Sequence, residues 1–256
     1  KQLSQNYLKF RNTAKFCLDN LTGFDPEQLV AAADMQELDR WAVTRLNSLI
    51  RRVFDSYDAY EFHAVSHAIN DFCVVDLSSF YFDIIKDRLY CDGEHSASRR
   101  SAQTAIYKIL DTLVRVISPI LALTSEEFWG VLPHDASADP ESVLFNDIPE
   151  VNPAWTLSED KAAYWATVMK LKADVNQALE KARAAKTCKK STDAKVTLYL
   201  NEQAMAVYET VKDADLAQMF IVSKVVPVQA AAPADAVAGE NVEGLAVTVE
   251  IGRAHV

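Results

Sequence analysis

Hydrophobic side chains recur every three or four positions through most of residues 1–135, the spacing of helices that bury one face. Gly23 and the pair Asp25-Pro26 interrupt the first run, and Pro119 interrupts the fourth. The pattern predicts four long helices, at about residues 3–21, 36–57, 72–91 and 96–119.

The stretch FCVVDLSSFYFDIIKDRLYC, residues 72–91, is rich in β-branched and aromatic residues, which favour strands. It is too long for one strand, however, and its apolar residues recur at helical spacing. We therefore predict a buried helix, in which tertiary burial outweighs the local strand preference. Its end carries Lys86, Asp87 and Arg88, which can reach phosphates or brace a neighbouring helix.

The sequence TSEE, from Thr124 to Glu127, fits a capping box, in which the Thr124 hydroxyl accepts the backbone N–H of Glu127. This pattern predicts that a short helix starts here and stops at Pro133. The paired glutamates then suit a helix N-terminus better than an acid–base pair. Residues 1–135 are therefore predicted to form an antiparallel bundle of about five helices.

Residues 136–157 are rich in Asp and Pro, which predicts a loop connecting two domains. An amphipathic pattern predicts one more helix at about 158–186. Further on we expect strands and a short helix, at about residues 196–200, 202–212, 219–228 and 244–249. The predicted fold is thus mostly α, an antiparallel helical bundle followed by a junction helix and a small α/β unit at 158–249.

The last seven residues, EIGRAHV at 250–256, match what a ligated sequencing adapter would encode if it were translated. We hypothesise that they are not native, and the same codons in the intact genome would end that idea. The chain also opens on Lys1 rather than on Met, so we expect a piece of a longer protein.

Composition narrows the functional classes. Half of the 256 residues are hydrophobic and 24% are charged, the balance of a soluble globular protein. We find neither an apolar run long enough to span a membrane nor a signal peptide, and the four scattered cysteines indicate reduced thiols in a cytosol. The six glycines form no phosphate-binding loop. A net charge of −10 repels nucleic acid at long range, so any RNA site must be a local basic face.

Motifs for chemistry are weak. His63, His67 and Asp71 are four positions apart and could in principle ligate a metal, but nothing nearby completes a tetrahedral set. We interpret them as a polar helix face. No Ser, His and Asp trio stands out for nucleophilic chemistry. We therefore predict no metal site and no catalytic residue in this chain.

Basic residues gather in one part of the chain. Between Lys161 and Lys195, nine Lys and Arg stand against three acids, an excess of six. Such a strip could neutralise phosphates and release counterions, although a solvated helix face explains it equally well. Arg99 and Arg100, early in the fourth helix, are similar candidates unless they serve to cap helix carbonyls.

Several long segments carry a resemblance to one family. They are YLKFRNTAKFCLDNLTGFDP (7–26), LDRWAV (38–43), DAYEFHAVSHAINDFCVVDLSSFYFDIIKDRLY (58–90) and SASRRSAQTAIYKILDTLVRVISPILALTSEEFWGVLP (96–133). In this order they are similar to the anticodon-binding domain of bacterial isoleucyl-tRNA synthetases, which are class I aminoacyl-tRNA synthetases. Residues 175–199 resemble the family's junction segment before its C-terminal zinc module. The resemblance covers nearly the whole chain apart from the last seven residues.

Two alternatives remain open. Valyl-tRNA synthetases share the bundle but typically place Trp-Asn-Ala where this chain has Arg11, Asn12 and Thr13, and leucyl enzymes diverge more. The other alternative is a non-catalytic helical adaptor or RNA-binding module. It stays open because the family's ATP-site signatures, HIGH and KMSKS, and its editing domain are absent from this sequence.

The resemblance implies a parent enzyme that attaches isoleucine to tRNA-Ile with ATP and Mg²⁺. That parent would be a cytoplasmic monomer with no membrane attachment, and its zinc site would lie beyond the end of this chain. The fragment alone is expected to be inactive and to hold no cofactor, and its partner would be tRNA-Ile.

The resemblance and the positions of the basic residues together suggest a tRNA-binding surface. On the bundle we expect it to include Lys9, Arg11, Asn12, Lys86, Arg88, Arg99 and Arg100. On the opposite side of the anticodon arm we expect Lys181, Arg183, Lys186, Lys189 and Lys190. Of these, Arg11 and Asn12 are the best candidates for reading bases, because both donate hydrogen bonds in fixed geometry.

Overall fold

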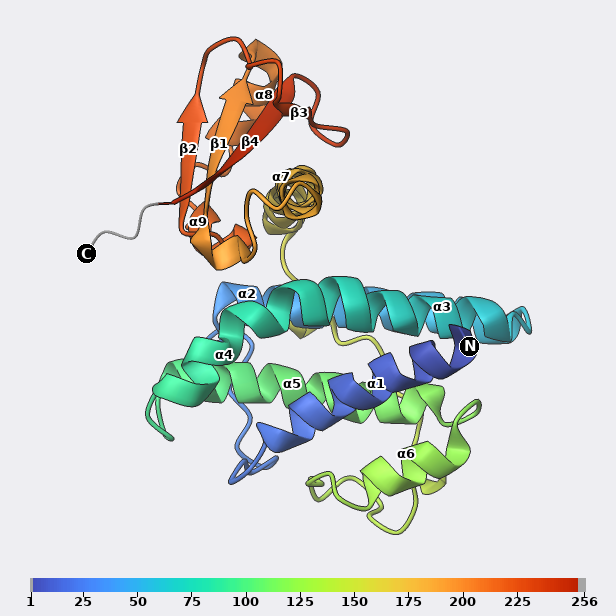
Figure 1. The fold of residues 1–256 in the computed structure, drawn as a ribbon. Coiled ribbons are helices and arrows are strands. Elements are labelled where there is room, and N and C mark those ends of the chain that lie inside the picture. Colours follow the sequence, from blue (N-terminus) through green and yellow to red (C-terminus); the bar gives the residue numbers. More distant parts are fainter. Residues whose placement is uncertain (1, 253–256) are drawn as a thin grey trace. The chain divides into compact units, whose positions relative to one another are not determined.

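The computed structural model describes residues 2–252, which divide into two compact units with the boundary between Leu157 and Ser158. The first unit is built from helices and loops, and the second combines helices with a small sheet (Figure 1). The predicted fold class, a mostly α chain with a helical bundle followed by a small α/β unit, is confirmed.

The helices of the first unit follow the predicted order. They are α1 (Gln2–Asp19), α2 (Glu37–Asp58), α3 (Phe62–Asp71), η1 (Phe72–Tyr81), α4 (Phe82–Cys91), α5 (Ala97–Ile117) and α6 (Ala122–Trp129), with short 3₁₀ turns η2 (Val143–Phe145) and η3 (Pro153–Trp155) in the loop that follows. Helix α5 packs against α1, α2, α4 and α6 and forms the centre of the bundle. Its apolar stripe is fully buried, including Ile106, Leu110 and Leu113.

One continuous rod runs through α3, η1 and α4 (teal in Figure 1). The predicted buried helix at 72–91 is therefore confirmed, but it is the second part of a longer rod. The middle ten residues of the rod, η1, form a π-helix, a rare form in which each backbone hydrogen bond spans five residues instead of four. Cys73, Leu77, Phe80 and Tyr81 are completely buried there. Packing on α1, α2 and α3 thus outweighs the strand preference of these residues.

The predicted capping box at Thr124 is wrong. Helix α6 begins at Ala122, so Thr124 lies inside it, and no side chain caps its start. The chain turns directly after Pro119 into the helix, with the Leu121 N–H donating to the Ile117 carbonyl at 2.9 Å. Glu126 is consequently not at a helix start. Its carboxylate instead accepts the Ser142 hydroxyl at 2.6 Å and holds the following loop.

The second unit begins with a long helix and continues as a four-stranded sheet. Its elements are α7 (Glu159–Ala184), η4 (Ser191–Asp193), β1 (Ala194–Leu200), α8 (Glu202–Glu209), α9 (Leu216–Phe220), β2 (Lys224–Val228), β3 (Val237–Ala238) and β4 (Leu245–Ile251). The strand order is β2-β1-β4-β3, with β2 parallel to β1 and the other pairs antiparallel. The strand predicted at 219–228 starts late, because Asp215 caps α9 and draws Met219 and Phe220 into a helix.

A buried carboxylate fixes α7 to the sheet. Asp174 is 1% exposed and accepts the backbone N–H groups of Glu240, Asn241 and Val242, each at 3.0 Å. A Cβ on Gly239 would lie 2.6 Å from this carboxylate, so a glycine is needed there. Helix α7 is thereby held beside β3 and β4 (Figure 1).

The end of the described chain belongs to the sheet. Strand β4 continues through Glu250 and Ile251, which pair with Lys195 and Ala194 of β1. The remaining residues of the suspected tail, 253–256, lie outside the described part of the chain. A non-native origin of residues 250–256 therefore stays a prediction.

Candidate nucleic-acid interface

The first helix presents three of the expected RNA-binding residues to solvent. Lys9, Arg11 and Asn12 are all exposed on α1. Arg11 forms no core ion pair; its Nη1 donates to the Tyr7 hydroxyl at 3.1 Å on the helix surface. Hydrogen bonds from Thr124 and then from Arg11 lower the pKa of that hydroxyl. Arg11 is therefore anchored at one end of its guanidinium and open at the other.

The two cations near the end of α4 have different environments. Arg88 is largely buried and forms a two-pronged ion pair with the fully buried Asp39, with Nη2 and Oδ2 2.6 Å apart and Nη1 and Oδ1 3.1 Å apart. It also donates to Ser98, through Nε to Oγ at 2.9 Å and through Nη2 to the carbonyl at 2.6 Å. Arg88 thus braces the bundle, the second of its two predicted roles. The Lys86 side chain is 44% exposed, and among residues 2–252 its one ion-pair partner is Asp83, one turn away.

Asp39 is the centre of a buried polar network. Besides Arg88 it accepts the Tyr81 hydroxyl at 2.7 Å and the Ser101 hydroxyl. Burial, reinforced by the Asp39 charge, raises the pKa of Tyr81 well above its usual value, so this phenol stays protonated and donating. The network joins α2, η1, α4 and α5, which rigidifies the scaffold that carries the exposed cations.

Arg99 and Arg100 lie in the first turn of α5, whose start is capped by the Ser96 hydroxyl. Both are partly exposed. Arg99 reaches the Asp92 carbonyl only at 3.4 Å, and its buried Nε has no partner among residues 2–252. Arg100 lies over the Phe24 ring at 5.3 Å. Both guanidinium groups therefore keep hydrogen-bonding capacity for an anion.

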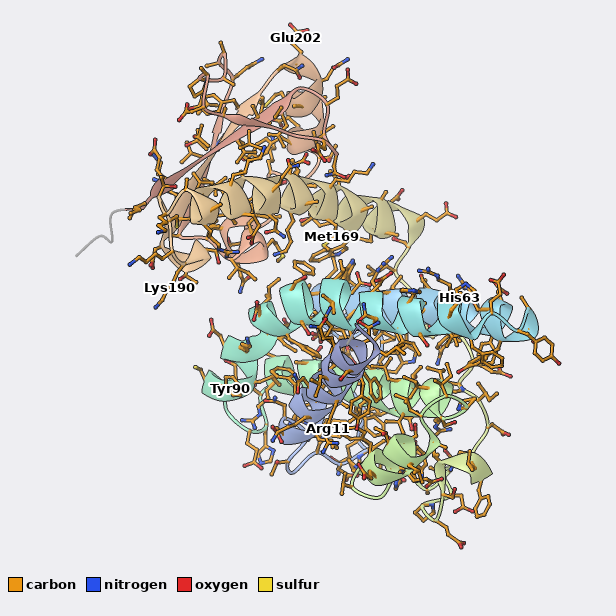
Figure 2. The ribbon with its side chains drawn as sticks, turned by 45° about the vertical axis from the view of Figure 1, so that its right-hand side comes forward. Arg11, His63, Tyr90, Met169, Lys190 and Glu202 are labelled. Carbon is orange, nitrogen blue, oxygen red and sulfur yellow. The ribbon has the colours of Figure 1, made fainter. Side chains whose placement is uncertain are left out.

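The end of α7 and the turn that follows carry the other expected cations. Lys181, Arg183, Lys186, Lys189 and Lys190 are all exposed, and residues 181–190 include no acid. Only Arg183 has an ion-pair partner within the described chain, Glu180. We call these five residues the α7 cationic strip; Figure 2 labels Lys190 at its far end. Cations at a helix C-terminus also stabilise the helix dipole, so part of the strip's role is structural.

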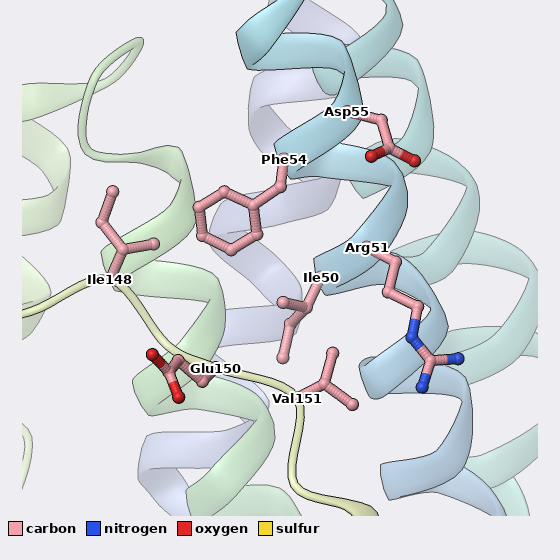
Figure 3. A pocket seen from close by; sticks show the side chains of 7 residues that line it. All are labelled: Ile50, Arg51, Phe54, Asp55, Ile148, Glu150 and Val151. Carbon is pink, nitrogen blue, oxygen red and sulfur yellow. The ribbon is translucent and has the colours of Figure 1, made fainter.

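The sequence analysis missed Arg51 and Arg52 on α2. Both are exposed, and neither guanidinium has an ion pair or hydrogen bond to another described residue. Arg51 borders a cavity of about 470 Å³ between α2 and residues 148–151 (Figure 3). The cavity has an apolar lining that includes Phe54, and its acids Asp55 and Glu150 offset the Arg51 charge. Its mixed charge makes it less suited to phosphate than the surfaces above.

Metal and redox sites find no support in the described part of the chain. His63, His67 and Asp71 are exposed, and no three His, Cys, Asp or Glu side chains among residues 2–252 converge to hold a metal ion. The four cysteines are free. Burial raises the pKa of the Cys73 thiol to about 12, so it is not a nucleophile at neutral pH. No described helix is long and apolar enough to cross a membrane.

Comparison with known proteins shows which family the chain is similar to. Residues 39–198 match the family model described as the anticodon-binding domain of tRNA ligase. The chain is 42% identical over 253 residues to an isoleucine–tRNA ligase of Caldanaerobacter subterraneus subsp. tengcongensis, covering 97% of this chain and 27% of that protein. It is also 42% identical to that of Syntrophotalea carbinolica (98% and 26%) and 44% identical to that of Bacillus mycoides (88% and 24%).

The family match covers well over half of the chain, and these relatives align with nearly all of it. The chain spans about a quarter of the length of the relatives. Its helical bundle, the rigid polar network within it and the exposed cations agree with this assignment. The chain therefore belongs to the family of tRNA-ligase anticodon-binding domains.

Proposed function

We propose that this chain is the anticodon-arm-binding part of an isoleucine–tRNA ligase and that its partner is tRNA-Ile. The observation that carries the proposal is the identity of 42% over nearly the whole chain to proteins named isoleucine–tRNA ligase. This similarity favours the isoleucine enzyme over the valine enzyme and over a non-catalytic adaptor.

The proposed RNA-binding surface consists of exposed or partly exposed cations on each unit, together with the amide of Asn12. On the first unit it comprises Lys9, Arg11, Asn12, Lys86, Arg99 and Arg100, and on the second unit it comprises the α7 cationic strip. Arg88 no longer belongs to it, because it is largely buried and four of its five N–H donors bind Asp39 and Ser98 inside the bundle. Phosphate contacts by these cations would supply affinity through counterion release, despite the net charge of −10.

Sequence discrimination needs donors and acceptors in fixed geometry at unpaired bases. Arg11 and Asn12 remain the best candidates on the first unit, since both are exposed on a rigid helix and Arg11 is oriented by Tyr7. A bidentate guanidinium and an amide can each pair with a base edge.

The whole ligase would join isoleucine to tRNA-Ile with ATP and Mg²⁺ in the cytoplasm, as a monomer. In this proposal the present chain contributes RNA binding alone, and chemistry and zinc binding take place in other parts of the ligase. On its own the chain would not charge tRNA.

Titration with RNA hairpins tests the proposal. The chain is mixed with the anticodon arm of tRNA-Ile, with the same hairpin carrying three changed anticodon bases, and with the anticodon arm of tRNA-Val. We expect the tightest binding to the isoleucine hairpin. Equal affinity for all three would reduce the role to general RNA binding, and absence of binding would favour a protein-binding adaptor.

A further inference from the structure

A groove in the second unit lies next to the α7 cationic strip. It is a cavity of about 570 Å³ between the end of α7, the β1–β4 part of the sheet and the loop before β3. Figure 1 shows α7 beside β4 and β3, where the groove is formed. Small residues form one wall, namely Ala178 and Ala182 of α7 and its C-cap residue Ala185. A wall of small side chains leaves room for a flat ring.

Polar groups without protein partners line the same groove. Lys181, Tyr199 and Asp235 all border it, and none of the three side chains forms a hydrogen bond or ion pair with another described residue. A cavity with a small-residue wall and a few convergent polar groups is the usual form of a ligand site. These groups together offer an ammonium, an aromatic ring with a hydroxyl, and a carboxylate.

The groove and the cationic strip are adjacent. Lys181 belongs to both, and Lys186 lies between Ala185 and Thr187, which line the groove. The Thr187 hydroxyl donates to the Ala182 carbonyl at 3.0 Å, so toward the groove it can only accept. Phosphates held by the strip would therefore lie beside the groove.

We propose that this groove receives one unpaired base of the RNA loop, splayed out of its stack, while the α7 cationic strip holds the adjoining phosphates. The inference rests on the proposed function, which it deepens by assigning a base pocket to the second unit. The base lies against the alanine wall of α7 and beside the Tyr199 ring, an arrangement that proteins use for single-stranded bases.

The chemistry of the groove selects the type of base. The Asp235 carboxylate and the Thr187 hydroxyl are acceptors. So is the Glu250 carboxylate, which also pairs with Lys195 at 3.3 Å. Lys181, which belongs to the strip, is a donor. Acceptors pair with the exocyclic amino groups of adenine, cytosine and guanine, each of which offers two N–H donors, whereas uracil offers only its single ring N–H. The groove therefore prefers an amino-bearing base to uracil at the position it receives.

A matched pair of variants tests the pocket. Ala185→Trp fills the groove from its wall, whereas Ala184→Trp places the same ring on the neighbouring exposed residue outside the lining. Both keep every cation of the strip. Binding of the full chain to the isoleucine anticodon hairpin is measured for each, with circular dichroism confirming the fold. We expect Ala185→Trp to weaken binding about tenfold and Ala184→Trp to leave it unchanged.

Asp235→Asn supplies a second variant that does not depend on tolerance of a large ring. It should reduce the preference for an amino-bearing loop base over uracil, measured with hairpins that differ at single loop positions. Equal binding by both tryptophan variants, with unchanged base preference in Asp235→Asn, would overturn the pocket while leaving the proposed function intact. Failure of the unaltered chain to bind any hairpin would refute both.

Discussion

Lys186 has a backbone conformation that residues with a side chain rarely adopt, with φ at 60° in the turn after α7. Glycine is the common residue at such helix ends, because a Cβ there is strained by about 1–2 kcal/mol. Neither burial nor an ion pair with a described residue compensates this strain, since Lys186 is exposed. The proposed contact between its ammonium and RNA would explain why a cation occupies the position.

Lys186→Gly should therefore separate stability from function. We expect the free energy of unfolding in urea to rise by up to about 1 kcal/mol, because the strain is removed. Affinity for the anticodon hairpin should fall, because one phosphate contact is lost. Lys189→Gly is the control for stability. It removes the same charge at a position where φ is not positive, so no backbone strain is relieved. Unchanged RNA affinity in Lys186→Gly would assign the lysine a purely structural role.

Asp76 permits a prediction for pH. Its burial raises the pKa of the carboxyl above 3.8, outweighing the opposing effect of the Arg45 ion pair at 3.1 Å. When the pKa of an acid is higher in the folded state than in the unfolded state, the protein loses stability as pH rises from the unfolded-state pKa to the folded-state pKa. Asp76→Asn removes this titration. The unfolding free energy of the variant minus that of the natural sequence should increase from about pH 3.8 upward and then level off.

Urea unfolding of both proteins at closely spaced pH values measures that difference. A difference that stays constant across the acidic range would show that the Asp76 pKa is not shifted. Sequence patterns could not predict this residue's environment, because Asp76 becomes buried only when η1 packs against α2.

At the scale of elements, helical spacing predicted the long helices well, since each buries an apolar stripe that repeats over several turns. The π-helical part of the rod escaped prediction, because its geometry depends on how η1 fits between α1, α2 and α3. The start of α6 was wrong for a related reason. A TSEE motif favours a helix start, but the turn after Pro119 had already begun the helix three residues earlier, with Leu121 rather than Thr124 at the N-cap.

The ion pair between Arg88 and Asp39 is another contact that sequence spacing could not predict. Lys86 and Arg88 are two positions apart in sequence, yet one is half-exposed and the other is used to join α2, α4 and α5. Spacing alone cannot separate two cations at the end of a helix when the partner of one is an aspartate 49 residues away.

Substitution of these two cations by methionine should give opposite results. Arg88→Met leaves the Asp39 charge buried and unpaired, so it should reduce the unfolding free energy by about 3–5 kcal/mol. Lys86→Met should change stability by less than about 0.5 kcal/mol but weaken RNA binding. Urea unfolding and hairpin titration at a temperature where both variants are folded measure the two effects. Comparable stability of the two variants would contradict the proposed division of roles.

At the scale of the whole molecule, a chain with a net charge of −10 is proposed to bind a polyanion. Local cationic surfaces resolve this conflict, since ionic screening limits repulsion from distant acids to about 8 Å at physiological salt. The strip was foreseeable from the sequence, because residues 181–190 hold five cations and no acid. The adjoining groove was not, because its walls come from α7, the sheet and a loop that are far apart in the chain.

The salt dependence of binding to the tRNA-Ile anticodon hairpin tests the central claim most directly. It is measured for the natural sequence and for a variant in which the five cations of the α7 strip are replaced by glutamine. The account predicts weaker binding by the variant and a plot of log affinity against log salt that is less steep by about one for each lost phosphate contact. Identical affinity and slope for the two proteins would contradict it.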